Sequence, residues 1–170
     1  MEYQLRDSKR KSNINSVFSK QSTKNLNKKH SISNLVTKMS NPTKEDAALL
    51  LQLMSYFAAN EKNNIASTWV YEKFNEKSYD DFKTKYPPGS EGYKNITRVA
   101  SNGELIGMLV NRDLLSEDLV FDLMGSMLWD KLGPIVHGAR QDANMPRLYE
   151  NYEVCANKYQ AWAEKNPPKV

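Results

Sequence analysis

Apolar side chains recur at every third or fourth position from residue 44 almost to the C-terminus, and this period constrains the fold more than any other feature of the sequence. Side chains with that spacing lie on one face of an α-helix, whereas a half-buried β-strand requires strict alternation. The sequence therefore predicts an all-α fold for residues 44–170, a bundle of four main helices plus a short one.

Capping signals place the first helices of this bundle. Thr43 is an expected N-cap with acidic residues just after it, which predicts a helix over 44–60. Its apolar stripe is Ala47, Leu50, Leu51, Met54, Phe57 and Ala58. A second helix is predicted over about 64–76. Its apolar residues are Ile65, Trp69 and Phe74. Ser78 then predicts the start of the short helix.

The third long helix is expected over 91–111, with Ser90 as its N-cap. Its inward residues are Tyr93, Ile96, Ala100, Gly103, Ile106 and Val110. Asn102-Gly103 is also a hairpin-turn dipeptide, but neither flank alternates, so the helical interpretation is preferred. Ala100, Gly103 and Gly107 form a strip of small residues against which another helix can pack closely.

Two further long helices complete the predicted bundle. One spans about 117–141 and is apolar nearly all round, so it is expected to be central, with a kink at Pro134. It begins at Ser116, an expected cap. The last begins at Met145-Pro146. Its seam has a spacing of four and three and consists of Leu148, Tyr152, Cys155, Tyr159 and Trp162.

Residues 1–43, the N-terminal arm, differ sharply from the rest in composition. They hold nine basic and two acidic side chains, a net charge of +7, whereas residues 44–170 carry −3. About 26% of the arm is apolar, against about 44% of the remainder. Burial of so few apolar groups does not offset the loss of chain entropy. We therefore predict a basic, largely irregular N-terminal arm (1–43) and a helical domain (44–170).

The arm also holds the residues that we expect to bind a partner. Its charged clusters attract polyanions, and its apolar residues at spacings of three and four can dock as a short amphipathic helix. The predicted binding residues are Arg6, Lys9, Arg10, Lys11, Lys24, Lys28, Lys29, Ile32, Leu35, Val36 and Met39. Alternatively, the arm is a solvated extension, or it lies against its own acidic domain or that of a neighbour.

Several classes of protein are disfavoured. No run of apolar residues is long enough to span a bilayer, and the N-terminus lacks the apolar core of a secretory signal. Cys155 is the single cysteine, so neither an internal disulfide nor a cysteine-rich metal site is expected. We expect a cytoplasmic protein without a metal or cofactor, with Cys155 in the core.

One group of residues on the predicted central helix is a candidate polar site. Asp130 and His137 are two turns apart, and Arg140 follows His137 by one turn, so the three share a face. Alternatively, His137 and Arg140 are solvated cations near a helix C-terminus, where the helix dipole favours them. Because no nucleophile has a matching spacing and no catalytic motif occurs, we predict that the protein is not an enzyme.

The segment from Gly103 to Tyr152 carries a resemblance to a known family. The motif Val110-x-Arg112-x-Leu114-Leu115-Ser116-Glu117-Asp118-Leu119-Val120 is followed by Gly125, Trp129, Leu132, Pro134, Ile135, Arg140 and the aromatic pair Tyr149 and Tyr152. These residues resemble the domain of unknown function 4760, over roughly 60–160, with the arm outside it. The resemblance implies a helical fold and a bacterial, archaeal or phage source, and it assigns no activity.

These features together favour a non-enzymatic helical interaction protein that binds a protein partner, or a second copy, through bundle and arm. A phage or bacterial accessory role that modulates a host or its defence is an expectation by analogy. The alternative is a nucleic-acid-binding accessory protein whose affinity resides in residues 1–43.

A salt series separates these two functions. If the arm binds nucleic acid, affinity should fall by orders of magnitude between low and moderate salt, because phosphate contacts release counterions. Docking through apolar residues should barely change. Retention of nucleic acid by residues 44–170 alone would contradict the assignment to the arm.

Overall fold

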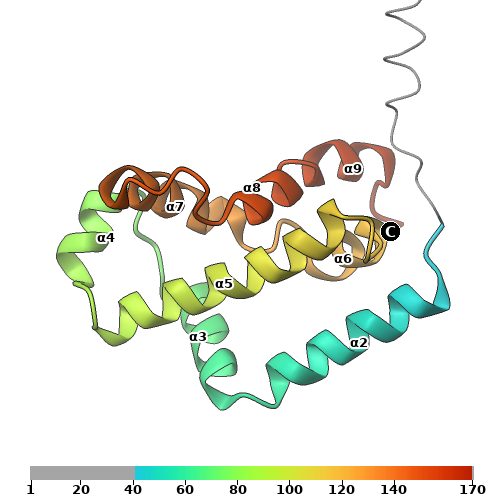
Figure 1. The fold of residues 1–170 in the computed structure, drawn as a ribbon, viewed down its shortest axis with the longest axis horizontal. Helices are drawn as coiled ribbons and strands as arrows, with labels where there is room; N and C mark the ends of the chain where they lie inside the picture. The colour runs from blue at the N-terminus through green and yellow to red at the C-terminus, as the bar shows by residue number, and fades with distance from the viewer. Residues whose placement is uncertain (1–40, 170) are drawn as a thin grey trace, which may run out of the picture. The chain divides into compact units, whose positions relative to one another are not determined.

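The computed structural model describes residues 41–169, and these fold into α-helices with no β-strand among them, which confirms the predicted all-α class. The helices are α2 (Lys44–Ala58), α3 (Glu61–Glu72), α4 (Tyr79–Lys85), α5 (Glu91–Asn111), α6 (Glu117–Met124), α7 (Trp129–Ala143), α8 (Glu150–Ala156) and α9 (Tyr159–Lys165). In Figure 1, α5 crosses the middle of the domain, with α7, α8 and α9 along one side and α2 and α3 along the other. None of the described helices has the length and apolar character needed to cross a bilayer.

Three helices have their N-cap residues where the sequence predicted them. The Thr43 hydroxyl accepts the Asp46 N–H at 3.0 Å, and the Asp46 carboxylate accepts the Thr43 N–H at 2.9 Å, which completes a capping box. Ser78 and Ser90 cap α4 and α5 in the expected way. The predicted range of α5 is confirmed, and its predicted inward residues are buried or half-buried.

Ser116 is the exception. It occupies the N-cap position of α6, but its side chain makes no capping hydrogen bond. Its backbone N–H instead donates to Asp46 Oδ1 at 2.8 Å. The Asp46 carboxylate therefore caps the start of α2 and also bonds to the start of α6. Asp46 and Ser116 are 70 positions apart in the chain.

The small residues of α5 allow close helix packing against α8. A Cβ atom at Gly107 would lie 2.4 Å from the backbone oxygen of Asn151, and one at Gly103 would lie 2.7 Å from the Tyr152 ring. Tyr152 is completely buried in this contact. The predicted close approach of a second helix to the strip is thus confirmed.

Glu104, on the same face of α5, supplies the N-terminal cap that α8 lacks locally. Tyr149 precedes α8 in a left-handed conformation (φ 54°), and its side chain makes no capping bond. Glu104 instead accepts the Tyr152 N–H at 2.9 Å and the Asn151 side-chain amide at 2.8 Å. A carboxylate near a helix N-terminus is favoured by both the free N–H groups and the helix dipole.

The predicted central helix over 117–141 is wrong in its continuity, because it is divided into α6 and α7. Gly125, Met127 and Leu128 have positive φ values between 54° and 66° and turn the chain. The Met127 side chain enters the core, and its carbonyl oxygen accepts a hydrogen bond from the Tyr152 hydroxyl. The break between α6 and α7 lets each helix bury its apolar face against different neighbours. Helix α6 packs on α2 and α9, whereas α7 packs on α4 and α8. Pro134 lies inside α7 and does not end the helix.

The predicted last helix is likewise divided, into α8 and α9, and α8 begins at Glu150 rather than at Met145. The predicted seam nevertheless identifies the inward residues. Tyr152 and Cys155 are fully buried, and Tyr159 and Trp162 pack against the core. The expected core position of Cys155 is confirmed, and burial raises the pKa of its thiol to about 12.

The second helix begins and ends earlier than the predicted 64–76 because Asn60 caps it and Lys73 follows its last turn. Of its three predicted apolar residues, Trp69 packs against the core and Phe74 is buried, but the expected inward position of Ile65 is wrong. Asn63, Ala66 and Val70 are buried, whereas Ile65 is 55% exposed. Phe74 lies beyond the end of α3 but is fully buried among other aromatic rings.

The tight contact between α5 and α8 predicts the effect of adding one methyl group. Gly107→Ala gains about 1 kcal/mol in helix propensity, but the new Cβ clashes with backbone, and such overpacking costs about 1–3 kcal/mol. Because the nearest atoms are backbone and cannot shift cheaply, we expect the upper part of that cost, and hence a net loss of about 1–2 kcal/mol in the free energy of unfolding measured by urea denaturation. Ser55→Ala, at an exposed position of α2, is the control and should change it by less than about 0.5 kcal/mol. A Gly107→Ala variant as stable as wild type would show that the contact is loose.

Candidate functional site

Helix α2 is rich in apolar residues but poorly covered by the rest of the described chain. Leu50 is its one fully buried residue. Leu51 and Met54, which the predicted stripe places inside, are 65% and 38% exposed. Tyr56 is 67% exposed. An apolar helix with this little cover leaves apolar surface in water, which marks candidate interaction surfaces.

Beside this helix lies a cavity of about 670 Å³, here called the α2 groove. Its walls come from α2, α3, α5, α6 and the turn before α7. The lining residues are Met54, Phe57, Ala58, Asn64, Ser67, Thr68, Tyr71, Glu72, Val99, Asn102, Gly103, Ile106, Leu123, Met124, Met127 and Leu128. Tyr71 is 70% exposed and Leu123 is 54% exposed, so the groove opens to solvent between large apolar side chains.

The chemistry of the groove is mainly apolar, with three methionines among the lining residues. Methionine side chains are flexible and polarizable, and they adapt to the shape of an apolar partner. Among the described residues, Glu72 is the one charged residue of the lining. The groove is therefore suited to an apolar surface that also carries a cation.

Polar contacts hold the walls of the groove in place. Lys131 of α7 donates through Nζ to the carbonyl oxygens of Val70, Tyr71 and Phe74 at 3.1, 2.6 and 3.2 Å. These oxygens lie at the C-terminal end of α3, where intrahelical donors run out. At the start of α3, the Asn64 amide donates to the carbonyl oxygen of Ala58, which ends α2, at 3.0 Å.

The predicted polar site is assembled in part. His137 Nε2 lies 2.8 Å from Glu153 Oε1, and the Arg140 guanidinium pairs with the other oxygen of Glu153. Arg140 also donates through Nε to the carbonyl oxygen of Leu148 at 2.6 Å. Asp130 is engaged elsewhere, as the acceptor of the Ser126 hydroxyl at 3.2 Å. The carboxylate that meets His137 and Arg140 is therefore Glu153 of α8 and not Asp130. Residue spacing within the predicted central helix cannot indicate Glu153, because it belongs to another helix.

This cluster connects α7 to α8. Burial by itself raises the pKa of Glu153, but hydrogen bonds from Arg140 and His137 outweigh it and hold the pKa below its usual value. The Arg140 side chain is 16% exposed and the His137 side chain 54%. The ion pair between Arg140 and Glu153 is thus shielded, whereas His137 lies at the surface.

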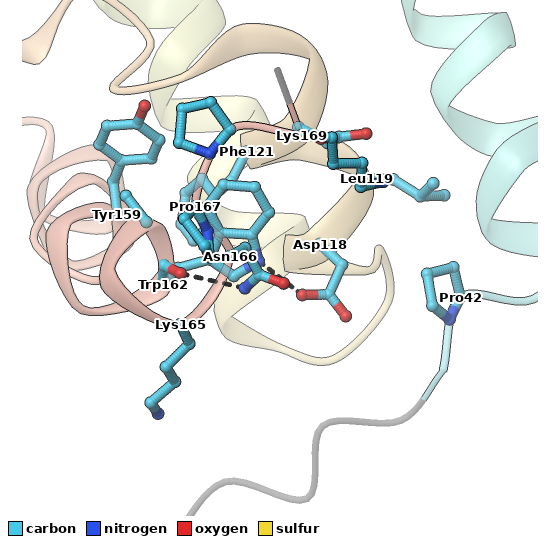
Figure 2. Close-up of a pocket in the computed structure, with 13 residues that line it drawn as sticks. Pro42, Asp118, Leu119, Phe121, Tyr159, Trp162, Lys165, Asn166, Pro167 and Lys169 are labelled. Carbon is cyan, nitrogen blue, oxygen red and sulfur yellow. Dashed lines mark hydrogen bonds between the residues drawn. The ribbon is translucent and has the colours of Figure 1, made fainter.

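A second hollow, of about 720 Å³, lies between α6, α9 and the C-terminal residues, with Pro42 on its opposite side (Figure 2). The Trp162 indole donates to Asp118 Oδ1 at 2.6 Å, and the Tyr159 ring stacks beside it. Its lining combines two carboxylates with two ammonium groups. These are Asp118, Asp122, Lys165 and Lys169. Because both signs of charge line this hollow, its charge favours neither an anionic nor a cationic ligand.

The predicted binding residues of the N-terminal arm lie outside the described residues. They are Arg6, Lys9, Arg10, Lys11, Lys24, Lys28, Lys29, Ile32, Leu35, Val36 and Met39. Their role stays a prediction from the sequence. Within residues 41–169, no three His, Cys, Asp or Glu side chains gather as metal ligands.

The described residues thus define an all-α protein with an open apolar groove. The chain belongs to the family described as Domain of unknown function (DUF4760), whose model matches residues 3–159. This confirms the resemblance but corrects its limits, because the match begins at residue 3 rather than near 60 and includes most of the arm. Comparisons with curated proteins and with solved structures gave no significant match.

The shielded ion pair predicts a pH-dependent contribution to stability. Glu153→Gln should lower the free energy of unfolding at pH 7 by about 1–2 kcal/mol, because the charged hydrogen bonds to Arg140 are lost. A carboxyl group with a lowered pKa stabilises the fold above its unfolded pKa of about 4.3 and loses this effect as pH falls through the folded value. The difference between wild type and variant should therefore shrink below about pH 4.

Glu150→Gln is the matched control, since Glu150 lies on the same helix and pairs with Arg147, whose side chain is 86% exposed. Exposed pairs contribute little, so we expect a loss below about 0.5 kcal/mol. Equal losses in both variants would show that the Glu153 pair has no special role. The free energy of unfolding of wild type and both variants is measured by urea denaturation at several pH values.

Proposed function

We propose that this chain is a non-enzymatic helical adaptor whose α2 groove binds the apolar face of an amphipathic helix from a protein partner. The observation that carries the proposal is the groove itself, a cavity of about 670 Å³ lined mainly by apolar and methionine side chains. An amphipathic helix that inserts its apolar face into such a groove is a recurring mode of recognition.

The shape of the groove favours a helix of a few turns. Met54, Phe57 and Ala58 line it from one face of α2, at spacings of three and four residues. A partner helix packed along this face meets ridges formed at the same spacing as its own. Exposed Leu51, one turn before Met54, extends the same apolar face.

The charge of the groove favours a partner helix with a lysine or arginine beside its apolar face. Glu72 lines the groove, and residues 44–170 carry a net charge of −3. A cation near Glu72 adds modestly to affinity and also fixes the orientation of the helix. The basic arm is a second proposed contact with the partner, and the alternative of nucleic-acid binding through residues 1–43 rests on the same charges.

A matched pair of leucines tests the proposal in the full-length protein. Leu123 lines the groove and is 54% exposed, whereas Leu114 lies outside it and is 56% exposed. The probe is a labelled synthetic 14-residue helix of leucine and lysine with an apolar face, followed by fluorescence anisotropy. Leu123→Asp should weaken binding about tenfold or more, about 1.4 kcal/mol, because the carboxylate replaces apolar contact. Leu114→Asp should leave binding within about twofold of wild type.

Three outcomes would contradict this function. Equal affinity of the two variants would place the peptide elsewhere. Loss of wild-type binding in moderate salt would mean that charge, rather than the groove, attracts the peptide. A change in oligomeric state with Leu123→Asp in sedimentation velocity would identify a second copy of the chain as the occupant.

A further inference from the structure

A third cavity, distinct in chemistry from the α2 groove, lies where the end of α2, the start of α3 and one face of α5 meet. It is an open hollow of about 330 Å³ and is lined by polar and cationic residues. Those that carry the argument are Tyr56, Asn60, Asn63, Lys94, Arg98 and Asn102. A cavity of this size is at the lower end of the range for small-molecule sites.

The charge of this cavity is positive. Lys94 and Arg98 are one turn apart on α5 and both line it, and among residues 41–169 no carboxylate belongs to the lining. Lys94 donates one hydrogen bond to Glu91 at the exterior, at 2.7 Å, which leaves two ammonium hydrogens. Arg98 has no hydrogen-bond or ion-pair partner among residues 41–169. Its guanidinium therefore retains all five N–H donors within that part of the chain.

Asn63 provides an independent observation that points to a ligand. It is 5% exposed, yet within the described segment its side-chain amide makes no hydrogen bond, although it lines the cavity. Its amide nitrogen and oxygen are not sealed from solvent, so they open onto the cavity, where native structures pair such groups with protein, ordered water or a bound molecule. The cavity is where such a partner can lie.

The start of α3 adds to the positive potential. Asn60 is its N-cap and uses its side-chain oxygen to accept the Lys62 N–H at 3.1 Å, so its amide nitrogen is left as a donor at the cavity. The twelve-residue helix directs its positive dipole end here. Amide donors, a guanidinium and a helix N-terminus are the groups that proteins use to bind phosphate.

We propose that this cavity binds a phosphate group, either as free phosphate or as the phosphate of a small monoester. Arg98 and Lys94 neutralise the charge, and the amides of Asn60 and Asn63 donate to the remaining oxygens. Free phosphate leaves part of the 330 Å³ unfilled, and a small monoester occupies more of it. This proposal is independent of the α2 groove and of the arm.

The test measures binding of inorganic phosphate to the full-length protein by isothermal titration calorimetry, with sodium chloride at equal ionic strength as the reference. Wild type should bind phosphate with one saturable site. Arg98→Gln should weaken binding at least tenfold, because the guanidinium donors are removed. Arg112→Gln, at an exposed position just after the same helix, is the matched control and should bind as wild type.

A second variant and a second ligand make the result decisive. Lys94→Gln replaces an exposed side chain and should also weaken binding severalfold, which keeps the test valid if Arg98→Gln fails to fold. A parallel titration with adenosine monophosphate distinguishes the sources, since tighter binding than phosphate assigns a monoester and weaker binding assigns the free ion. Absence of saturable phosphate binding by wild type, or unchanged binding by Arg98→Gln and Lys94→Gln, would overturn the proposal.

Discussion

The close contact between α5 and α8 is the interaction on which the rest of the domain depends. Because Gly107 lacks a side chain, the backbone of α8 lies directly on α5, and Gly103 leaves room for the Tyr152 ring. From there the Tyr152 hydroxyl reaches the Met127 carbonyl oxygen, and the ring packs against Trp129 with centroids 4.8 Å apart. These two glycines of α5 thereby position α8, the turn after α6 and the start of α7.

Polar side chains from one helix then complete the ends of another. Glu104 supplies N-terminal acceptors to α8, Lys131 supplies C-terminal donors to α3, and Asp46 joins the starts of α2 and α6. Each of these contacts satisfies backbone groups that local capping leaves unpaired. They also fix the relative positions of helices that are too short to be stable alone. The walls of the α2 groove result from these tertiary contacts.

The two proposed sites use the same scaffold for opposite chemistry. The α2 groove is apolar with one carboxylate, whereas the proposed phosphate cavity is polar and cationic. Both take part of their lining from α2, α3 and α5, and Asn102 of α5 belongs to both. Exposure of apolar groups on α2 contributes nothing to the stability of the isolated domain, which is consistent with a surface kept for binding.

The sequence by itself determined the all-α class, the caps at Thr43, Ser78 and Ser90, the range of α5 and the role of its small residues. These features follow from local periodicity and capping chemistry, which neighbouring residues decide. Tertiary structure alone decided the breaks at 125–128 and 157–158, since a continuous apolar pattern cannot show which partners cover each half. It also decided that Glu153 joins His137 and Arg140, and that Leu51 and Met54 remain exposed, because both depend on elements distant in the chain.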